Sequence, residues 1–192
     1  MRGKRALIYF ATGNLHKVEE VKYVLKDYPL EVRPIDVKGV EIQAESVEEI
    51  AENSALQAAN TSKLPIIVED TGLFISALNG FPGPYASYIH KTLSIEGTLK
   101  LLRGVKNRGA VFRSAVAFSD SKTTLSFTGE SIGIITAEAR GKQVFGFDPV
   151  FEPCDGPGKT FGEMGLEEKS AISHRARAVR KFADWYVKRI SI

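Results

Sequence analysis

The stretch "IIVEDTGLFIS", residues 66–76, joins two apolar runs through two adjacent acids and Thr71-Gly72. The first run predicts a short central strand that ends at Glu69 and Asp70. Burying a carboxylate is costly unless a metal, a helix N-terminus or a base-catalysed reaction at that place favours negative charge. In α/β sheets, ligands bind at the carboxyl ends of strands. Because strand neighbours point to opposite faces, one acid is expected to face a site. We favour Asp70; the alternative is that Asp70 caps a turn through its own backbone.

The segments on either side of this strand alternate between helical and strand periodicity. Ser46 followed by Glu49 has the pattern of a capping box, and Pro34 favours an edge position for its strand. The other predicted strands are 5–12, 30–37, 110–120 and 123–138, with a turn at 119–122, and the predicted helices are about 15–25, 46–63, about 86–102 and about 169–190. This mixture, without a linker or repeat, predicts a single α/β domain over residues 1–192.

Composition limits the partners and the compartment. No apolar run reaches membrane-spanning length and no targeting signal is recognised, so we expect a cytoplasmic protein with no membrane partner. The formal charge of +3 is a small excess of bases, not the concentrated patch of a nucleic-acid binder. Cys154 is the single cysteine, so an internal disulfide and a Cys/His metal site are excluded, and any metal would have oxygen ligands.

The segment "ATGNLHK", residues 11–17, turns from the first strand into the first helix. Backbone N–H groups in the first turn of a helix form an anion site, and Lys17 lies one turn in, where its ammonium could reach the same phosphate. The alternative is that Thr12 or Asn14 only caps the helix. One Gly13 in a turn does not decide between them.

A third acid, Glu41 in "VEIQAE", residues 40–45, could join Asp70 on one cation. Hard divalent ions that also bind phosphates take one or two carboxylates and keep several waters. The alternative for Glu41 is a solvated loop glutamate.

Two later segments could bind a base. The segment "FGFDPVF", residues 145–151, places aromatic rings around Gly146 and Asp148, which would be unusual core residues, and a flat ring beside a carboxylate suits a purine. The segment "EEKSAISHRARA", residues 167–178, contains neighbouring cationic and imidazole groups that could bind the same edge of a ligand. The alternatives are an aromatic core and a solvated basic face.

Taken together, "ATGNLHK", "VEDTGL", "GFPGPY", "FGFDPVF" and "EEKSAISHR" resemble, in this order, the motif series of the inosine triphosphate pyrophosphatase family. The resemblance spans about Leu7 to Arg175. It implies an α/β fold that is elongated and two-lobed, with a long mixed sheet lining a central cleft. It also implies hydrolysis of ITP, dITP and XTP to the monophosphate and pyrophosphate, with Mg²⁺, in a homodimer.

The resemblance also implies roles for individual residues. Asp70 would be the proton acceptor and, with Glu41, a metal ligand. Some relatives carry lysines near positions 54 and 87, where this chain has Ser54 and Ser87, so no such role is carried over. The implied substrate-binding residues are Thr12, Gly13, Asn14, Leu15, His16, Lys17, Thr71, Phe145, Gly146, Phe147, Asp148, Lys169, His174 and Arg175.

Base selectivity can be argued from hydrogen-bond donors. Hypoxanthine and xanthine present an O6 acceptor where adenine presents an amino donor. Hydrogen-bond donors from His174 and Arg175 would therefore favour binding of the first two bases and disfavour binding of adenine. Guanine shares the O6 atom, and the sequence does not indicate what excludes it. Two alternatives stay open: a nucleotide pyrophosphatase for other modified bases, and a module that binds nucleotides without turnover.

Overall fold

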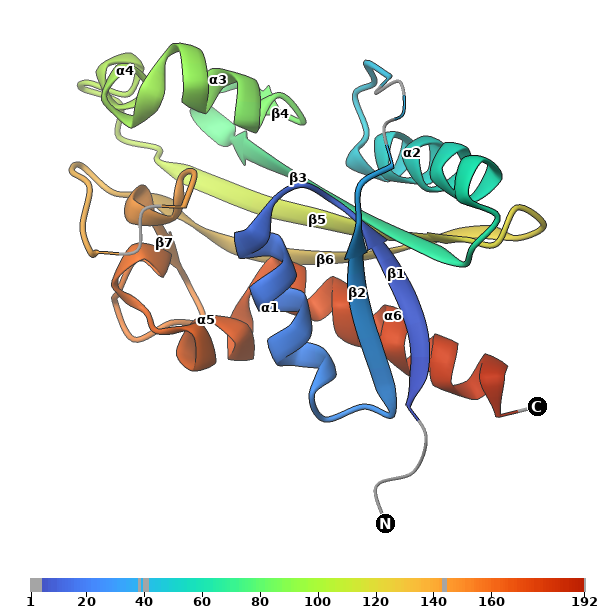
Figure 1. Ribbon diagram of the computed structural model, residues 1–192. Helices are drawn as coiled ribbons and strands as arrows, with labels where there is room; N and C mark the ends of the chain where they lie inside the picture. Colours follow the sequence, from blue (N-terminus) through green and yellow to red (C-terminus); the bar gives the residue numbers. More distant parts are fainter. Residues whose placement is uncertain (1–4, 38, 40–41, 143–144, 192) are drawn as a thin grey trace.

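The computed structural model describes residues 5–37, 39, 42–142 and 145–191 (Figure 1). The strands are β1 (Ala6–Ala11), β2 (Leu30–Ile35), β3 (Ile66–Ile75), β4 (Pro82–Gly83), β5 (Gly109–Ser119), β6 (Thr124–Ile135) and β7 (Phe151–Pro153). The helices are α1 (Leu15–Leu25), α2 (Val47–Ser62), α3 (Ala86–Thr92), α4 (Ser94–Leu101), α5 (Leu166–Ile172) and α6 (His174–Ile190), with 3₁₀ turns at Ser76–Leu78, Asp148–Val150 and Phe161–Glu163.

The strands form one open, mixed, seven-stranded sheet in the order β2-β1-β3-β5-β6-β7, with β4 paired to β3. Strands β1, β2 and β3 run parallel, and β3, β5, β6 and β7 alternate in direction. The expected α/β fold with a long mixed sheet is confirmed, and Pro34 lies on the edge strand β2 as predicted. In the part of the chain that the structure describes, no helix has the length and apolar character needed to cross a membrane.

The predicted end of the central strand at Asp70 is wrong. Strand β3 continues through Thr71 and Gly72 to Ile75, because the long strand β5 pairs with it over its whole length. Gly72 makes this continuation possible: a Cβ there would lie 2.7 Å from the Phe74 ring and 2.9 Å from the backbone of β4. The acids therefore lie in the middle of a strand, not at its carboxyl end.

Helices cover both faces of the sheet (Figure 1). Helices α1 and α6 pack against one face, where Ile8, Phe118 and Phe182 belong to the largest apolar cluster. Helix α2 covers the other face through small residues such as Ala51 and Ala55, which allow it to approach β5 closely. A cavity beside α2 lies at the level of the two acids.

Two predicted helices are each divided in the structure. The last one, expected from about Lys169 to Ile190, is α5 and α6, separated by Ser173 in an extended conformation. Ser173 caps α6 by accepting a hydrogen bond from the Ala176 amide at 3.2 Å. The helix expected over 86–102 is α3 and α4, and Ser94 at the junction has a φ of 61°.

Candidate active site

A cleft of about 740 Å³ opens between the turn after β1, the middle of β3, helix α3, residues 145–148 and the start of α6. It brings together most of the predicted site residues: Thr12, Gly13, Asn14, His16, Lys17, Asp70, Thr71, Phe145, Gly146, Phe147, Asp148, His174 and Arg175. Leu15 is 73% exposed and is not part of the lining. Lys169 lines an adjoining pocket, and Glu41 lies outside the described residues.

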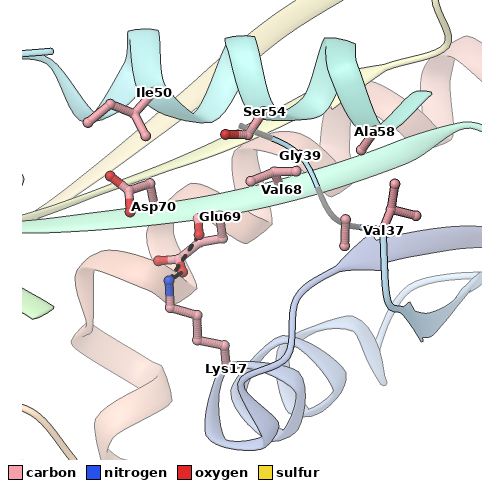
Figure 2. A pocket seen from close by; sticks show the side chains of 10 residues that line it. Lys17, Val37, Gly39, Ile50, Ser54, Ala58, Val68, Glu69 and Asp70 are labelled. Carbon is pink, nitrogen blue, oxygen red and sulfur yellow. Dashed lines mark hydrogen bonds and ion pairs between the residues drawn. The ribbon is translucent and has the colours of Figure 1, made fainter. Parts of the chain in front are cut away.

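A second cavity, of about 240 Å³, lies between β3 and helix α2 (Figure 2). Lys17 and Asp70 line both this cavity and the cleft, so the two hollows meet at these side chains. Ser54 reaches the smaller cavity from α2, whereas Ser87 reaches the cleft from α3. Ser54 and Ser87, for which no lysine role was carried over, thus lie on the walls of these two hollows.

The turn after β1 is ordered by its own side chains. The Asn14 side chain accepts hydrogen bonds from the amides of His16 and Lys17 at 3.1 and 3.3 Å, and the Asn14 amide donates to Thr12 Oγ1 at 3.1 Å. The capping interpretation is therefore right for Asn14, and two of the first-turn N–H groups that could bind an anion are already engaged. Phosphate binding by this turn stays a prediction.

Glu69 and Asp70 point to opposite faces of β3, as strand alternation predicts (Figure 2). The Glu69 side chain is only 1% exposed, and its carboxylate lies 2.8 Å from the Lys17 ammonium. Lys17 also donates to the Glu69 carbonyl at 3.0 Å, and Ser114 donates to the carboxylate at 2.5 Å. Burial raises the pKa of Glu69, but Arg175 and Lys17 outweigh burial and hold that pKa well below its ordinary value.

Arg175 is the largest fully buried side chain of the described residues. Its guanidinium donates to Glu69 at 3.0 Å, to Glu20 at 2.6 Å and to Thr71 at 3.2 Å. Burial raises the pKa of Glu20, yet Arg175 and Lys169 lower it to about 2. Much of the hydrogen-bonding capacity of Arg175 is thus committed to the protein, although the side chain also lines the cleft.

The ionic chain continues to the base segment. Lys169 donates to Glu20 at 2.7 Å and to Asp148 at 2.5 Å, and all three side chains are buried. Burial raises the pKa of Asp148, and Lys169 only partly offsets it. An unbroken series of ion pairs therefore connects the Lys17 end of the cleft with the Asp148 end.

Aromatic and imidazole rings form the base end of the cleft. Phe145 is half-buried and faces His16, with ring centroids 5.3 Å apart, whereas Phe147 is 3% exposed and belongs to the core. The His174 ring stacks on Phe112 at 4.5 Å. Burial, followed by Arg175, keeps the pKa of His174 well below its ordinary value, so the ring is neutral at pH 7 and offers one donor and one acceptor.

The oxygen-rich metal site that we predicted is only partly described. Asp70 lies where the two hollows meet, and its expected partner Glu41 is outside the described residues. Within the described ranges, no three His, Cys, Asp or Glu side chains gather as a metal site. Asp70 alone still suits Mg²⁺, because this ion accepts one carboxylate when phosphates and waters complete its shell.

The family model of the Ham1 family matches residues 8–185, nearly the entire chain. The chain belongs to the Ham1 family. Two Ham1 proteins of known structure share its fold: one from Coxiella burnetii has a TM-score of 0.83 at 30% identity, and one from Staphylococcus aureus has 0.82 at 28% identity. Each comparison covers 95% of this chain and 99% of the other.

Relatives of this Ham1-family chain carry the name dITP/XTP pyrophosphatase. The one from Methanopyrus kandleri is 47% identical over 185 residues, which are 96% of this chain and 98% of the relative. The one from Ignicoccus hospitalis is 49% identical over 179 residues, which are 92% and 94% of the two chains. The resemblance to the inosine triphosphate pyrophosphatase family is confirmed.

Sequence reasoning missed several residues of this Ham1-family site. Glu20 and Glu69 lie buried at its centre, and His90 and Phe112 line the cleft from α3 and β5. Glu69 was missed because strand alternation places it on the opposite face of β3 from Asp70, and only one of the two acids was expected to face the site. Glu20 looked like any surface helix glutamate, because only the packing of α1 against α5 and α6 buries it.

Proposed function

We propose that this protein hydrolyses the noncanonical purine nucleotides ITP, dITP and XTP to the monophosphate and pyrophosphate. Its role would be to remove deaminated purine nucleotides before polymerases use them. The observation that carries the proposal is that a single cleft joins the Lys17 turn, Asp70 and the base segment 145–148. The names of relatives at 47% and 49% identity support the same reaction.

The mechanism begins with the phosphates at the meeting point of the two hollows. Lys17 supplies an ammonium there, and Asp70 supplies the carboxylate. Asp70 accepts a hydrogen bond from a water and orients it toward the α-phosphorus. The water oxygen bonds to this phosphorus as the anhydride bond to the β-phosphate breaks, and Asp70 accepts the proton that the water loses. Lys17 stabilises the negative charge that develops on the departing pyrophosphate. The smaller cavity provides space beyond Asp70 for that leaving group.

A divalent cation fits this arrangement, and Mg²⁺ is the ion that we propose. Asp70 would hold it, and the assignment of Glu41 as a second ligand rests on the family resemblance alone. When bound, the ion supplies positive charge to the phosphate oxygens and acidity to a nearby water.

The base end supports selection for an O6 acceptor. His174 is neutral, lines the cleft and has a buried Nδ1 without a hydrogen-bond partner among the described residues. A neutral imidazole donates from one nitrogen, and such a donor suits the O6 of hypoxanthine or xanthine better than the amino group of adenine. Phe145 lines the same cleft and offers a half-buried ring on which the base can stack. In this proposal Arg175 acts mainly by holding the pocket together.

Product analysis tests the reaction. With ITP and Mg²⁺, inosine monophosphate and pyrophosphate should appear in equal amounts, as separated by anion-exchange chromatography. Inosine diphosphate with free phosphate would instead indicate a phosphatase and refute the proposed bond cleavage.

Two other proposals are separated by the same assay. A pyrophosphatase for other modified bases would release pyrophosphate from a modified pyrimidine nucleotide faster than from ITP. A binding module would retain ITP unchanged. The homodimer stays a prediction from the family resemblance, and light scattering of the purified chain measures it.

A further inference from the structure

One buried residue lies between the two ends of the cleft. The Glu69 carboxylate contacts the ammonium of Lys17 at 2.8 Å and the guanidinium of Arg175 at 3.0 Å. Ser114 and Thr71 donate further hydrogen bonds to the same carboxylate. A carboxylate with this many donors is held in a single orientation.

The contact with Lys17 has two parts. The Glu69 carboxylate forms an ion pair with the ammonium at 2.8 Å, and the Glu69 backbone carbonyl accepts a hydrogen bond from it at 3.0 Å. The Lys17 side chain is nevertheless 19% exposed and lines both hollows. Lys17 is therefore fixed in position by Glu69 while its ammonium remains available to an anion.

We propose that Glu69 is a positioning residue that holds Lys17 against the cleft wall and partly neutralises it, so that pyrophosphate is bound loosely enough to leave after hydrolysis. The identity of the anion rests on the proposed function. A lone ammonium at this point would attract a multiply charged phosphate more strongly, because the carboxylate beside it opposes that attraction. Glu69 itself needs no contact with the substrate.

The sign of this effect separates positioning from a purely structural role. Glu69→Gln keeps the size of the side chain and removes its charge. Titration calorimetry with inorganic pyrophosphate in Mg²⁺ buffer should give about tenfold tighter binding than the wild type, the size expected for one partly screened charge. With ITP, both kcat and KM should fall, because the product leaves slowly. A structural defect would instead weaken binding and raise KM.

Glu20→Gln is the matched control. It removes a carboxylate from the same buried network, one whose ion pairs are with Arg175 and Lys169, whereas Lys17 pairs with Glu69. Its pyrophosphate affinity should stay within about twofold of the wild type. Equal tightening in both variants would overturn the proposal, because the effect would then come from the net charge of the network.

Glu69→Asp tests the same idea if Glu69→Gln does not fold. It keeps the charge but withdraws it from Lys17, so pyrophosphate should bind about two- to threefold tighter. Affinity equal to or below that of the wild type in the folded variants overturns the proposal. Because calorimetry needs no turnover, this result is independent of whether the wild type hydrolyses ITP, which is the separate test of the proposed function.

Discussion

Replacing Arg175 with alanine should destabilise the protein strongly. The guanidinium is buried and pairs with Glu69 at 3.0 Å and Glu20 at 2.6 Å. Arg175→Ala leaves both carboxylates in the interior without this partner. Losing one member of a buried ion pair costs about 3–5 kcal/mol, because the remaining charge stays desolvated. For a chain of this length, the melting temperature should fall by roughly 6–20 °C.

Arg177→Ala provides the control on the same helix. Arg177 pairs with Asp155 at the surface, where the two side chains are 36% and 56% exposed. Such pairs contribute at most about 1 kcal/mol, so this variant should lose less than about 4 °C. Calorimetric melting and urea unfolding of both variants beside the wild type measure the difference.

The pH dependence of the Arg175→Ala defect gives a second test. In the wild type the pKa of Glu20 is about 2, so it stays ionised at pH 4. Without Arg175, Lys169 alone offsets burial, so the pKa of Glu20 rises and protonation at acidic pH relieves part of the cost of the buried charge. The stability difference between variant and wild type should therefore shrink as pH falls from 7 to 4. A loss below about 1 kcal/mol at pH 7, or one equal to that of Arg177→Ala, would refute the reasoning.

Three further predictions concern other parts of the site. Asp70→Asn should lower ITP turnover at least about 100-fold while nucleotide binding persists; near-normal kcat would remove Asp70 from the mechanism. Burial raises the pKa of Glu20, but the cations beside it lower it from 4.5 to about 2. Ionised Glu20 therefore contributes about 3 kcal/mol to the free energy of unfolding above pH 4.5, and this contribution is lost as the pH falls toward 2. In Glu20→Gln, the free energy of unfolding measured with urea should change less between about pH 4.5 and pH 2 than in the wild type. Gly72→Ala should cost about 1–3 kcal/mol, because its Cβ would lie 2.7 Å from the Phe74 ring; unchanged melting would contradict this packing.

Much of the fold was predictable because its signals are local. The capping pattern of Ser46 and Glu49 marks the start of α2, and the Ser46 side chain does accept from the Glu49 amide. The two strands expected over 110–138 form the β5–β6 pair in register from Gly109 to Ser119. These features depend on residues that are close in sequence.

The remaining features depend on contacts that are distant in sequence. The extension of β3 from Thr71 to Ile75 comes from pairing with β5 residues that lie 35 to 43 positions away, and no local pattern indicates it. At Ser173 the helix is interrupted, and the Ser173 side chain instead caps α6 by accepting a hydrogen bond from the Ala176 amide. The burial of Glu20 follows from Lys169 and Arg175, which approach it only after three helices have packed. Motif order predicted residues that one cleft brings together, but only the packing reveals the ion pairs that connect them.

The direct test of the central claim is pyrophosphate release from ITP, XTP, ATP and GTP, measured side by side with Mg²⁺ and with a chelator. Our account predicts release from ITP and XTP that disappears on chelation, while ATP and GTP stay almost intact. Equal release from all four nucleotides would keep the phosphate chemistry and contradict the base pocket. Release from none of them would contradict the enzymatic function itself.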